Sequence, residues 1–292
     1  TEDQRYLRVN YSTPIHASGL KLNLAVTRLD YELGEELRSS DLDGDSTVYT
    51  LGATYPVFRS RLENLFVDTN IDYKLMNDFA SDSTIRDREF TNLNVALRGD
   101  TRLLKGGYTS YSVKATLGSL DRSGDENDYL VDKQTFETDG SFTKLNIDLS
   151  RFQRLNTEWT LYASLRSQLA FSNLDSAEKF SLTGPAGVRA YASGESAGDQ
   201  GWFATLEARY DVPKFNIYGA NLQLQAFLDT GSVTLSKDKY DGYTPSNTDE
   251  TNQYSLTGIG LGAVLRKPRE YELSAMYAKQ INADVDVLEN LK

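Results

Sequence analysis

The sequence contains no cysteine and only one histidine, His16, in 292 residues. Without cysteine there is no disulfide framework, no thiolate metal ligand and no thiol redox chemistry. His16 fits a polar residue in a short turn, so the serine-rich stretches lack the histidine base of an ordinary Ser-His-Asp triad. We therefore expect a protein that is not an enzyme and that has no metal site and no cofactor.

Basic charge and long apolar runs are also scarce. The formal net charge is −11 and the isoelectric point is near 4.7, which argues against nucleic acid as a partner because phosphate binding needs a basic surface. No window of 18 or more apolar residues is present, so the sequence predicts no transmembrane helix. The mean hydropathy of −0.49 does not exclude a membrane barrel, whose apolar face occupies only every second residue.

Aromatic residues and regular alternation are abundant. The 18 Tyr and 12 Phe, beside 6 Pro and 2 Met, favour strands. Apolar and polar residues alternate with a period of two in twelve segments. These lie at about 4–14, 20–33, 47–58, 64–77, 90–103, 108–120, 142–154, 158–172, 201–212, 220–230, 254–266 and 270–281. Many of them have ten residues or more, which matches a tilted strand that crosses a bilayer.

The connections between these segments alternate in length. Short turns lie near 16–18, 60–61, 105–107, 156–157, 214–216 and 267–268, and long polar loops lie at 34–46, 78–89, 121–141, 173–200 and 231–253. Short turns on one side and long extracellular loops on the other are typical of outer-membrane barrels. Strands of soluble sandwiches also alternate apolar and polar residues, but these strands are usually only five or six residues long. We therefore predict an all-β fold, a transmembrane antiparallel β-barrel.

This alternation places both ends of the sequence on the long-loop side. The first segment is followed by a short turn, and the last segment ends in the polar tail 282–292. Bacterial barrels normally begin and end in the periplasm, so the pattern predicts an odd number of strands beyond each end. Residues 1–292 are then expected to form one partial barrel domain.

The loop 173–200 carries an arginine, Arg189, among small, turn-forming residues. On the two strands that follow it, alternation places Glu207 and Asp229 on the inward, polar face. We predict that this loop folds into the lumen and that Arg189 pairs with Asp229, with Glu207 as a second candidate partner. An arginine–carboxylate pair can be bidentate, which fixes geometry as well as charge.

The motifs around this arginine resemble those of the TpsB transporters of two-partner secretion, the ShlB/FhaC/HecB-type haemolysin secretion/activation proteins. The loop motif Val-Arg-Gly-Tyr/Phe is matched by Val188, Arg189 and Tyr191, the strand motif Phe-x-Asp-x-Gly by Phe227, Asp229 and Gly231, and Gly-Asp-x-Gly-Trp by Gly198, Asp199, Gly201 and Trp202. Ala190 stands where the family usually has glycine. If that position needs a positive φ, alanine is disfavoured there by roughly 1 kcal/mol.

The resemblance implies a barrel of sixteen strands, preceded by two periplasmic polypeptide-transport-associated (POTRA) domains and a plug helix. The motif loop follows strand eleven in the family, so this chain would hold strands 4–15, without the POTRA domains. The implied function is secretion of a large unfolded TpsA exoprotein (an adhesin, haemolysin or contact-dependent toxin) across the outer membrane of a Gram-negative bacterium, without ATP. The implied partners are this exoprotein, lipid and lipopolysaccharide, and the barrel is expected to be monomeric.

On this basis we expect Arg189 to hold the loop in one conformation for transport. In a wet lumen the ion pair would contribute about a few kcal/mol at most, so its value would lie in positioning. The competing interpretation is a charge pair that only stabilises the barrel. Two other protein classes stay open: a passive porin, which would not need the paired motifs, and an outer-membrane assembly factor of the same superfamily, which would carry them.

Other acidic residues have simpler explanations. Asp41, Asp43 and Asp45 resemble the start of a calcium loop, but Gly52 stands where the twelfth-position glutamate belongs, so solvated loop charge is favoured. Inward carboxylates such as Asp68 and Asp72 recur on many strands without a focus, which indicates lumen lining rather than acid–base chemistry.

Overall fold

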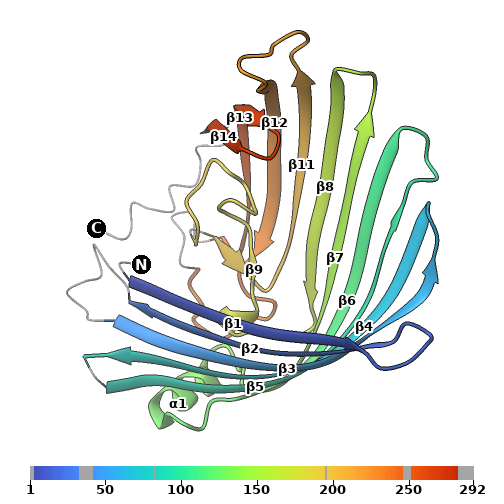
Figure 1. The fold of residues 1–292 in the computed structure, drawn as a ribbon. Coiled ribbons are helices and arrows are strands. Elements are labelled where there is room, and N and C mark those ends of the chain that lie inside the picture. Colours follow the sequence, from blue (N-terminus) through green and yellow to red (C-terminus); the bar gives the residue numbers. More distant parts are fainter. Residues whose placement is uncertain (1–2, 33–41, 82, 195, 246–250, 282–292) are drawn as a thin grey trace.

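A computed structural model describes residues 3–32, 42–81, 83–194, 196–245 and 251–281. Twelve antiparallel strands form one sheet in chain order, with β1 and β14 at its two edges. The strands are β1 (Asp3–Pro14), β2 (Lys21–Glu32), β3 (Leu42–Arg59), β4 (Glu63–Ala80), β5 (Ser83–Thr101), β6 (Gly107–Asp121), β7 (Gly140–Arg154), β8 (Trp159–Ala170), β11 (Gln200–Asp211), β12 (Asn221–Thr234), β13 (Gln253–Lys267) and β14 (Tyr271–Gln280). The sheet curls strongly and stays open (Figure 1).

The twelve predicted strands are all present, but the predicted loop 78–89 is wrong, and the described part of the predicted loop 34–46 (residues 42–46) also belongs to a strand, β3. Residues 78–80 form the end of β4 and residues 83–89 the start of β5, and the two strands pair up to Ala80 and Ser83. These two strands reach 18 and 19 residues, more than a bilayer crossing needs. Polar side chains such as Asp78 and Arg88 suggested a loop, yet they alternate with the strand period and form ion pairs with each other on the inner side. Polarity alone therefore misplaced the strand ends.

The two faces of the sheet differ in chemistry as the alternation predicts. On β11, the outward Trp202 and Leu206 are 41% and 54% exposed, whereas the inward Phe203 and Glu207 are 5% and 4% exposed. Large apolar side chains cover the outer face on most strands, among them Val26, Leu51, Ile71, Leu93, Val95, Leu97, Leu149, Leu165 and Leu228. A soluble sandwich would bury this face, so the exposed apolar surface favours contact with lipid.

A short helix that the sequence did not suggest lies in the predicted loop 121–141. Helix α1 (Glu126–Gln134) begins after Asp125, whose side chain accepts a hydrogen bond from the Asp128 backbone N–H. No helix in the part of the chain that the structure describes is long and apolar enough to cross a membrane.

The loop between β8 and β11 lies within the curve of the sheet (Figure 1). It contains a 3-10 turn, η2 (Ser176–Glu178), and a small hairpin formed by β9 (Phe180–Ser181) and β10 (Ala197–Gly198). Apolar side chains of its central part pack against the inward face of β11, β12 and β13 in one cluster: Phe180, Leu182, Val188, Tyr191, Phe203, Val233, Tyr254 and Leu256. This packing holds the centre of the loop against the inner wall.

Candidate functional site

Arg189 sits at the inner wall with three acceptors around its guanidinium. Its Nε and Nη2 donate to the two carboxylate oxygens of Asp229, each at 2.8 Å, which is a bidentate pair. Nη1 donates to Glu207 Oε2 at 3.0 Å, and Nη2 also reaches Thr205 Oγ1 at 3.1 Å. The backbone N–H of Arg189 donates to Asp229 as well, at 3.2 Å. The ion pair that the sequence predicts is present, and Glu207 joins it.

The strand residues around the arginine complete a closed set of contacts. The guanidinium carbon lies 3.4 Å from the centre of the Phe227 ring, so the cation stacks on the ring face. Thr205 Oγ1 donates to Asp229 Oδ1 at 2.6 Å. Burial alone would lower the pKa of Arg189, but its hydrogen bonds to and attraction by Asp229 and Glu207 raise that pKa instead. The arginine is therefore held as a cation.

This site is drier than a wet lumen would make it. The Asp229 side chain is fully buried and that of Glu207 is 5% exposed, while that of Arg189 is 16% exposed. The loop itself covers these carboxylates, and reasoning from strand alternation alone did not account for that cover. Removing one partner of a buried, hydrogen-bonded pair typically costs about 3–5 kcal/mol, whereas an exposed, screened pair contributes about 0–1 kcal/mol.

The other motif residues shape the loop around the pair. Val188 is fully buried, and its backbone N–H donates to Leu182 O at 2.8 Å, while Tyr191 lies in the same apolar cluster. Gly231 allows the loop to approach β12 closely. A Cβ at Gly231 would lie 2.5 Å from both Leu182 Cδ1 and the Trp202 carbonyl oxygen. Phe227, as noted, supports the guanidinium.

Ala190 does not carry the strain that the sequence suggested. Among the described residues, the non-glycine positions with positive φ do not include Ala190. Its methyl group instead faces β13 at Gly258, where an added Cβ would lie 2.7 Å from Ala190 Cβ. Because residue 258 is a glycine, there is room on β13 for the methyl group of Ala190.

We expect Gly258→Ala to loosen the centre of the loop, because the new methyl group and that of Ala190 cannot occupy the same space. Crowding of this kind typically costs about 1–3 kcal/mol. Limited proteolysis of the folded protein should then cleave within 184–194 several-fold faster than in the wild type. The second substitution Ala190→Gly should restore slow cleavage, and equal cleavage in the single and double variants would contradict this packing.

Asp199, from the Gly-Asp-x-Gly-Trp match, connects three segments. Its fully buried carboxylate accepts hydrogen bonds from the backbone N–H groups of Leu174 and Lys237 at 3.2 and 2.8 Å, and Lys179 Nζ lies 3.1 Å away. Burial raises the pKa of Asp199, although the lysine opposes that effect. Asp199 therefore ties both ends of the 173–200 loop to the loop after β12.

Two acidic loop residues that the motifs do not include are also buried in ion pairs. Asp175 contacts Arg88 and Arg122, and Glu178 lies between two lysines. The sequence offered only an indirect sign of these ion pairs. Alternation places Lys74, Arg88 and Lys144 on the inward faces of β4, β5 and β7, and buried cations need anionic partners. Nothing in the sequence pattern states which carboxylates those partners are, because the contacts are long-range.

The described residues contain no cluster of three or more His, Cys, Asp or Glu side chains that could hold a metal ion. Asp43 and Asp45 lie on strand β3 rather than in a calcium loop, and Asp41 lies outside the described residues. Beside the loop, a hollow of about 410 Å³ borders Arg189 and reaches Tyr162 and Arg209 on the wall.

Known proteins match this chain along most of its length. The heme/hemopexin transporter protein HuxB of Haemophilus influenzae strain 86-028NP is 25% identical over 283 residues, which are 96% of this chain and 48% of HuxB. The chain thus spans about half the length of the curated relatives it matches. CdiB from Escherichia coli has a TM-score of 0.77 at 19% identity, covering 97% of this chain and 50% of CdiB.

A second solved structure, BamA from Haemophilus ducreyi lacking POTRA domains 1–3, has a TM-score of 0.67 at 14% identity and covers 97% of this chain and 60% of that chain. At these identities, CdiB and BamA show a shared fold. The family is decided by sequence: the model of the haemolysin secretion/activation protein ShlB/FhaC/HecB family matches residues 1–265. The chain belongs to the haemolysin secretion/activation protein ShlB/FhaC/HecB family.

Proposed function

We propose that this chain is the barrel part of an outer-membrane translocator that secretes a large unfolded TpsA-type exoprotein. The observation that carries the proposal is the motif loop on the inner wall, held by the buried Arg189–Asp229 pair in a member of this family. The translocator resides in the outer membrane of a Gram-negative bacterium as a monomeric barrel, in contact with lipid and lipopolysaccharide. It is a transporter, not an enzyme, and needs no cofactor.

The chemistry of the wall supports this reading. The outward face is apolar and exposed, which suits lipid, while buried polar side chains such as Asn92, Asn94 and Gln168 point to the other side. A barrel of sixteen strands is wide enough for an aqueous channel that a loop can occupy. The sequence has no Gly-Lys-Ser/Thr phosphate-binding motif, in keeping with transport without ATP.

Two alternatives have different consequences. An outer-membrane assembly factor of the same superfamily is the second candidate, because it would carry the same paired motifs around Arg189 and Asp229. A passive porin is the third, and it gives no reason for an arginine buried against two carboxylates beneath a loop. The experiment must therefore separate loss of one secreted protein from a general defect in the outer membrane.

We would delete the gene in its own bacterium and follow a large secreted protein encoded beside it. The expected result is that this exoprotein disappears from the culture medium and returns when the full-length gene is restored. The amounts of unrelated outer-membrane barrels should stay unchanged, and their general loss would instead identify an assembly factor. Normal secretion of the exoprotein in the deletion strain would contradict the proposal.

A further inference from the structure

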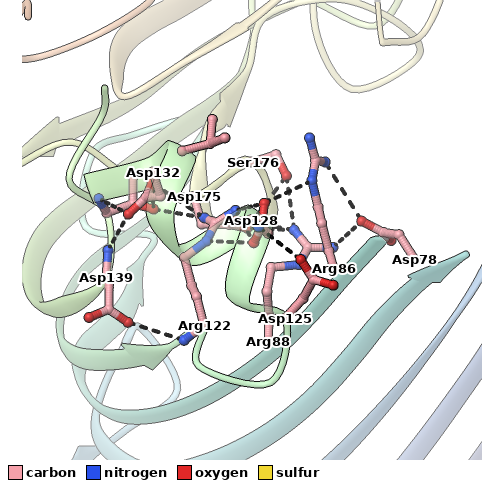
Figure 2. Close-up of polar contacts among 12 residues, drawn as sticks. Asp78, Arg86, Arg88, Arg122, Asp125, Asp128, Asp132, Asp139, Asp175 and Ser176 are labelled. Carbon is pink, nitrogen blue, oxygen red and sulfur yellow. Dashed lines mark hydrogen bonds and ion pairs between the residues drawn. The ribbon is translucent and has the colours of Figure 1, made fainter. Parts of the chain in front are cut away.

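The first part of the 173–200 loop is held by a second group of buried charges, remote from Arg189. Asp175 lies between two arginines: Arg88 Nη1 is 3.0 Å from Asp175 Oδ1, and Arg122 Nη1 is 2.9 Å from Asp175 Oδ2. All three side chains are at most 8% exposed. Figure 2 shows both guanidinium groups converging on this one carboxylate. Asp175 is also the N-cap of η2, accepting from the Ala177 backbone N–H at 2.9 Å.

Glu178, at the end of η2, has the same arrangement with lysines. Its Oε1 lies 2.5 Å from Lys74 Nζ, and its Oε2 lies 2.7 Å from Lys144 Nζ. Asn92 donates to the same carboxylate at 2.9 Å, and Lys144 also donates to the Glu178 carbonyl at 2.7 Å. The Glu178 side chain is 5% exposed. We call Asp175 and Glu178, with the four cations around them, the proximal anchor, and Arg189 with Asp229 and Glu207 the distal anchor.

The two anchors use different parts of the wall. The proximal anchor draws its cations from β4, β5 and β7 and from the residue that follows β6, whereas the distal anchor uses β11 and β12. Strand β8 lies between these two groups in the sheet. The loop leaves β8, turns back to the β4–β7 side at Asp175, and only then reaches the β11–β12 side at Arg189. The loop therefore crosses the inner face of the sheet and is fixed on each side of β8, and we call residues 173–200 the strap.

Arg122 connects the proximal anchor to helix α1. Its Nη2 lies 2.8 Å from Asp128 Oδ2 (Figure 2). Its Nη1 donates to Thr138 Oγ1 at 2.8 Å. Asp132, also on α1, accepts from the Thr138 backbone N–H at 2.8 Å. The loop after β6, through Asp128 and Thr138, therefore holds the Arg122 side chain in position to contact Asp175.

The two halves of the strap depend on different forces. In the distal half, four loop side chains enter the large apolar cluster: Phe180, Leu182, Val188 and Tyr191. In the proximal half, the loop contributes only Leu174 to the apolar cluster formed with Phe90, Leu120, Phe142 and Ala170. Charged contacts are therefore a larger part of the restraint on the proximal half. Loss of Asp175 leaves Arg88 with Asp78 and Arg122 with Asp128, so both arginines lose their link to the loop. Loss of Glu178 removes the carboxylate that Lys74 and Lys144 share.

We propose that Asp175 and Glu178 are positioning residues for transport, which fix the first half of the loop on the β4–β7 wall independently of the Arg189 motif. The inference builds on the proposed function, because it assigns these two carboxylates a part in the same transport step. Without them the distal anchor can stay formed while the proximal half of the strap leaves the wall and enters the path of the exported chain.

The test uses a single cysteine as a reporter. Residues 1–292 contain no cysteine, and any cysteine elsewhere in the full-length protein is first replaced by serine. Ala170 is 3% exposed and lies under the proximal half against Leu174, so Ala170→Cys is protected while the loop is in place. Reaction of this thiol with a water-soluble maleimide is compared in the full-length protein with and without Asp175→Asn plus Glu178→Gln. The matched control is Asp72→Asn, an inward carboxylate that bonds Thr50 and Asn94 on the wall.

We expect the double variant to label at least about ten-fold faster and to secrete the neighbouring exoprotein at least about ten-fold less, with Asp72→Asn like the wild type on both counts. Heat-modifiable migration on gels checks that the barrel folds, and the isosteric Glu178→Gln alone serves if the double variant does not. Unchanged labelling, or fast labelling with normal secretion, would overturn the proposal. Absence of secretion in the wild type would instead refute the proposed function, while the labelling still tests the anchor.

Discussion

Replacing Arg189 with alanine is expected to lower exoprotein secretion at least about ten-fold while the barrel still folds. The substitution removes the guanidinium that pairs with the fully buried Asp229, whereas Glu207 keeps its second partner, Arg209, at 2.6 Å. An unpaired buried charge such as that of Asp229 typically costs about 3–5 kcal/mol, which the structure can avoid only by moving the loop or admitting water. The exoprotein in the medium is measured by immunoblot against the amount of folded transporter in the membrane.

One further variant tests whether the geometry of the Arg189–Asp229 pair matters beyond its positive charge, and a second serves as a control. Arg189→Lys keeps the cation but cannot make the two parallel bonds to Asp229, so we expect it to restore only part of the secretion. Arg98→Ala is the matched control, since Arg98 pairs with Asp68 on neighbouring strands. Normal secretion by Arg189→Ala would show that the pair only stabilises the barrel.

The double variant Arg189→Ala, Asp229→Ala should secrete as much exoprotein as the more severe of the two single variants. Both substitutions remove the same bidentate pair, and effects of residues that act as one unit are not additive. A double variant with the summed defects of the two singles would mean that each residue has a separate role.

The strands were predictable because each of them meets two different surroundings. On β11, Trp202 and Leu206 face outward, and Phe203 and Glu207 face inward. Residues that face opposite sides of a strand alternate along the sequence with a period of two. The same rule placed Asp229 on the inner face, which is why its pairing with Arg189 could be inferred. The resemblance to known motifs supplied the loop that brings the arginine there.

Contacts made by the loops could not be inferred in the same way. Helix α1 has no strong apolar stripe, and only Asp132 in it is buried, so no helical periodicity marks it. The contacts of Asp175 join residues that are 87 and 53 positions apart. The dryness of the Arg189 site depends on the loop that covers it, which strand alternation does not describe.

Acid is expected to release the proximal half of the loop through Glu178. Burial alone would raise the pKa of this carboxyl, but Lys74 and Lys144 outweigh burial and lower the pKa from 4.5 to about 2. Because the folded-state pKa lies below the ordinary value, the carboxylate stabilises the docked loop above about pH 4.5. That stabilisation is lost as the pH falls through 2. The difference corresponds to about 3 kcal/mol.

Pepsin measures this release because the protease is active in acid. Cleavage within 173–200 is followed between pH 4.5 and 2 and divided by the rate for an unfolded peptide at the same pH. The wild type should become more susceptible by at least about ten-fold, a fraction of the full linkage effect. Glu178→Gln should be cleaved quickly across the whole range with little dependence on pH, since its side chain does not titrate.

Asp199 acts in the opposite sense, and the comparison removes its effect. Burial raises the pKa of Asp199, so protonation of this group in acid favours the folded state and works against release. Asp199 is present in both the wild type and Glu178→Gln, so the difference between their pH profiles belongs to Glu178. A wild-type profile as flat as that of Glu178→Gln would show that the two lysines do not hold the loop through this carboxylate.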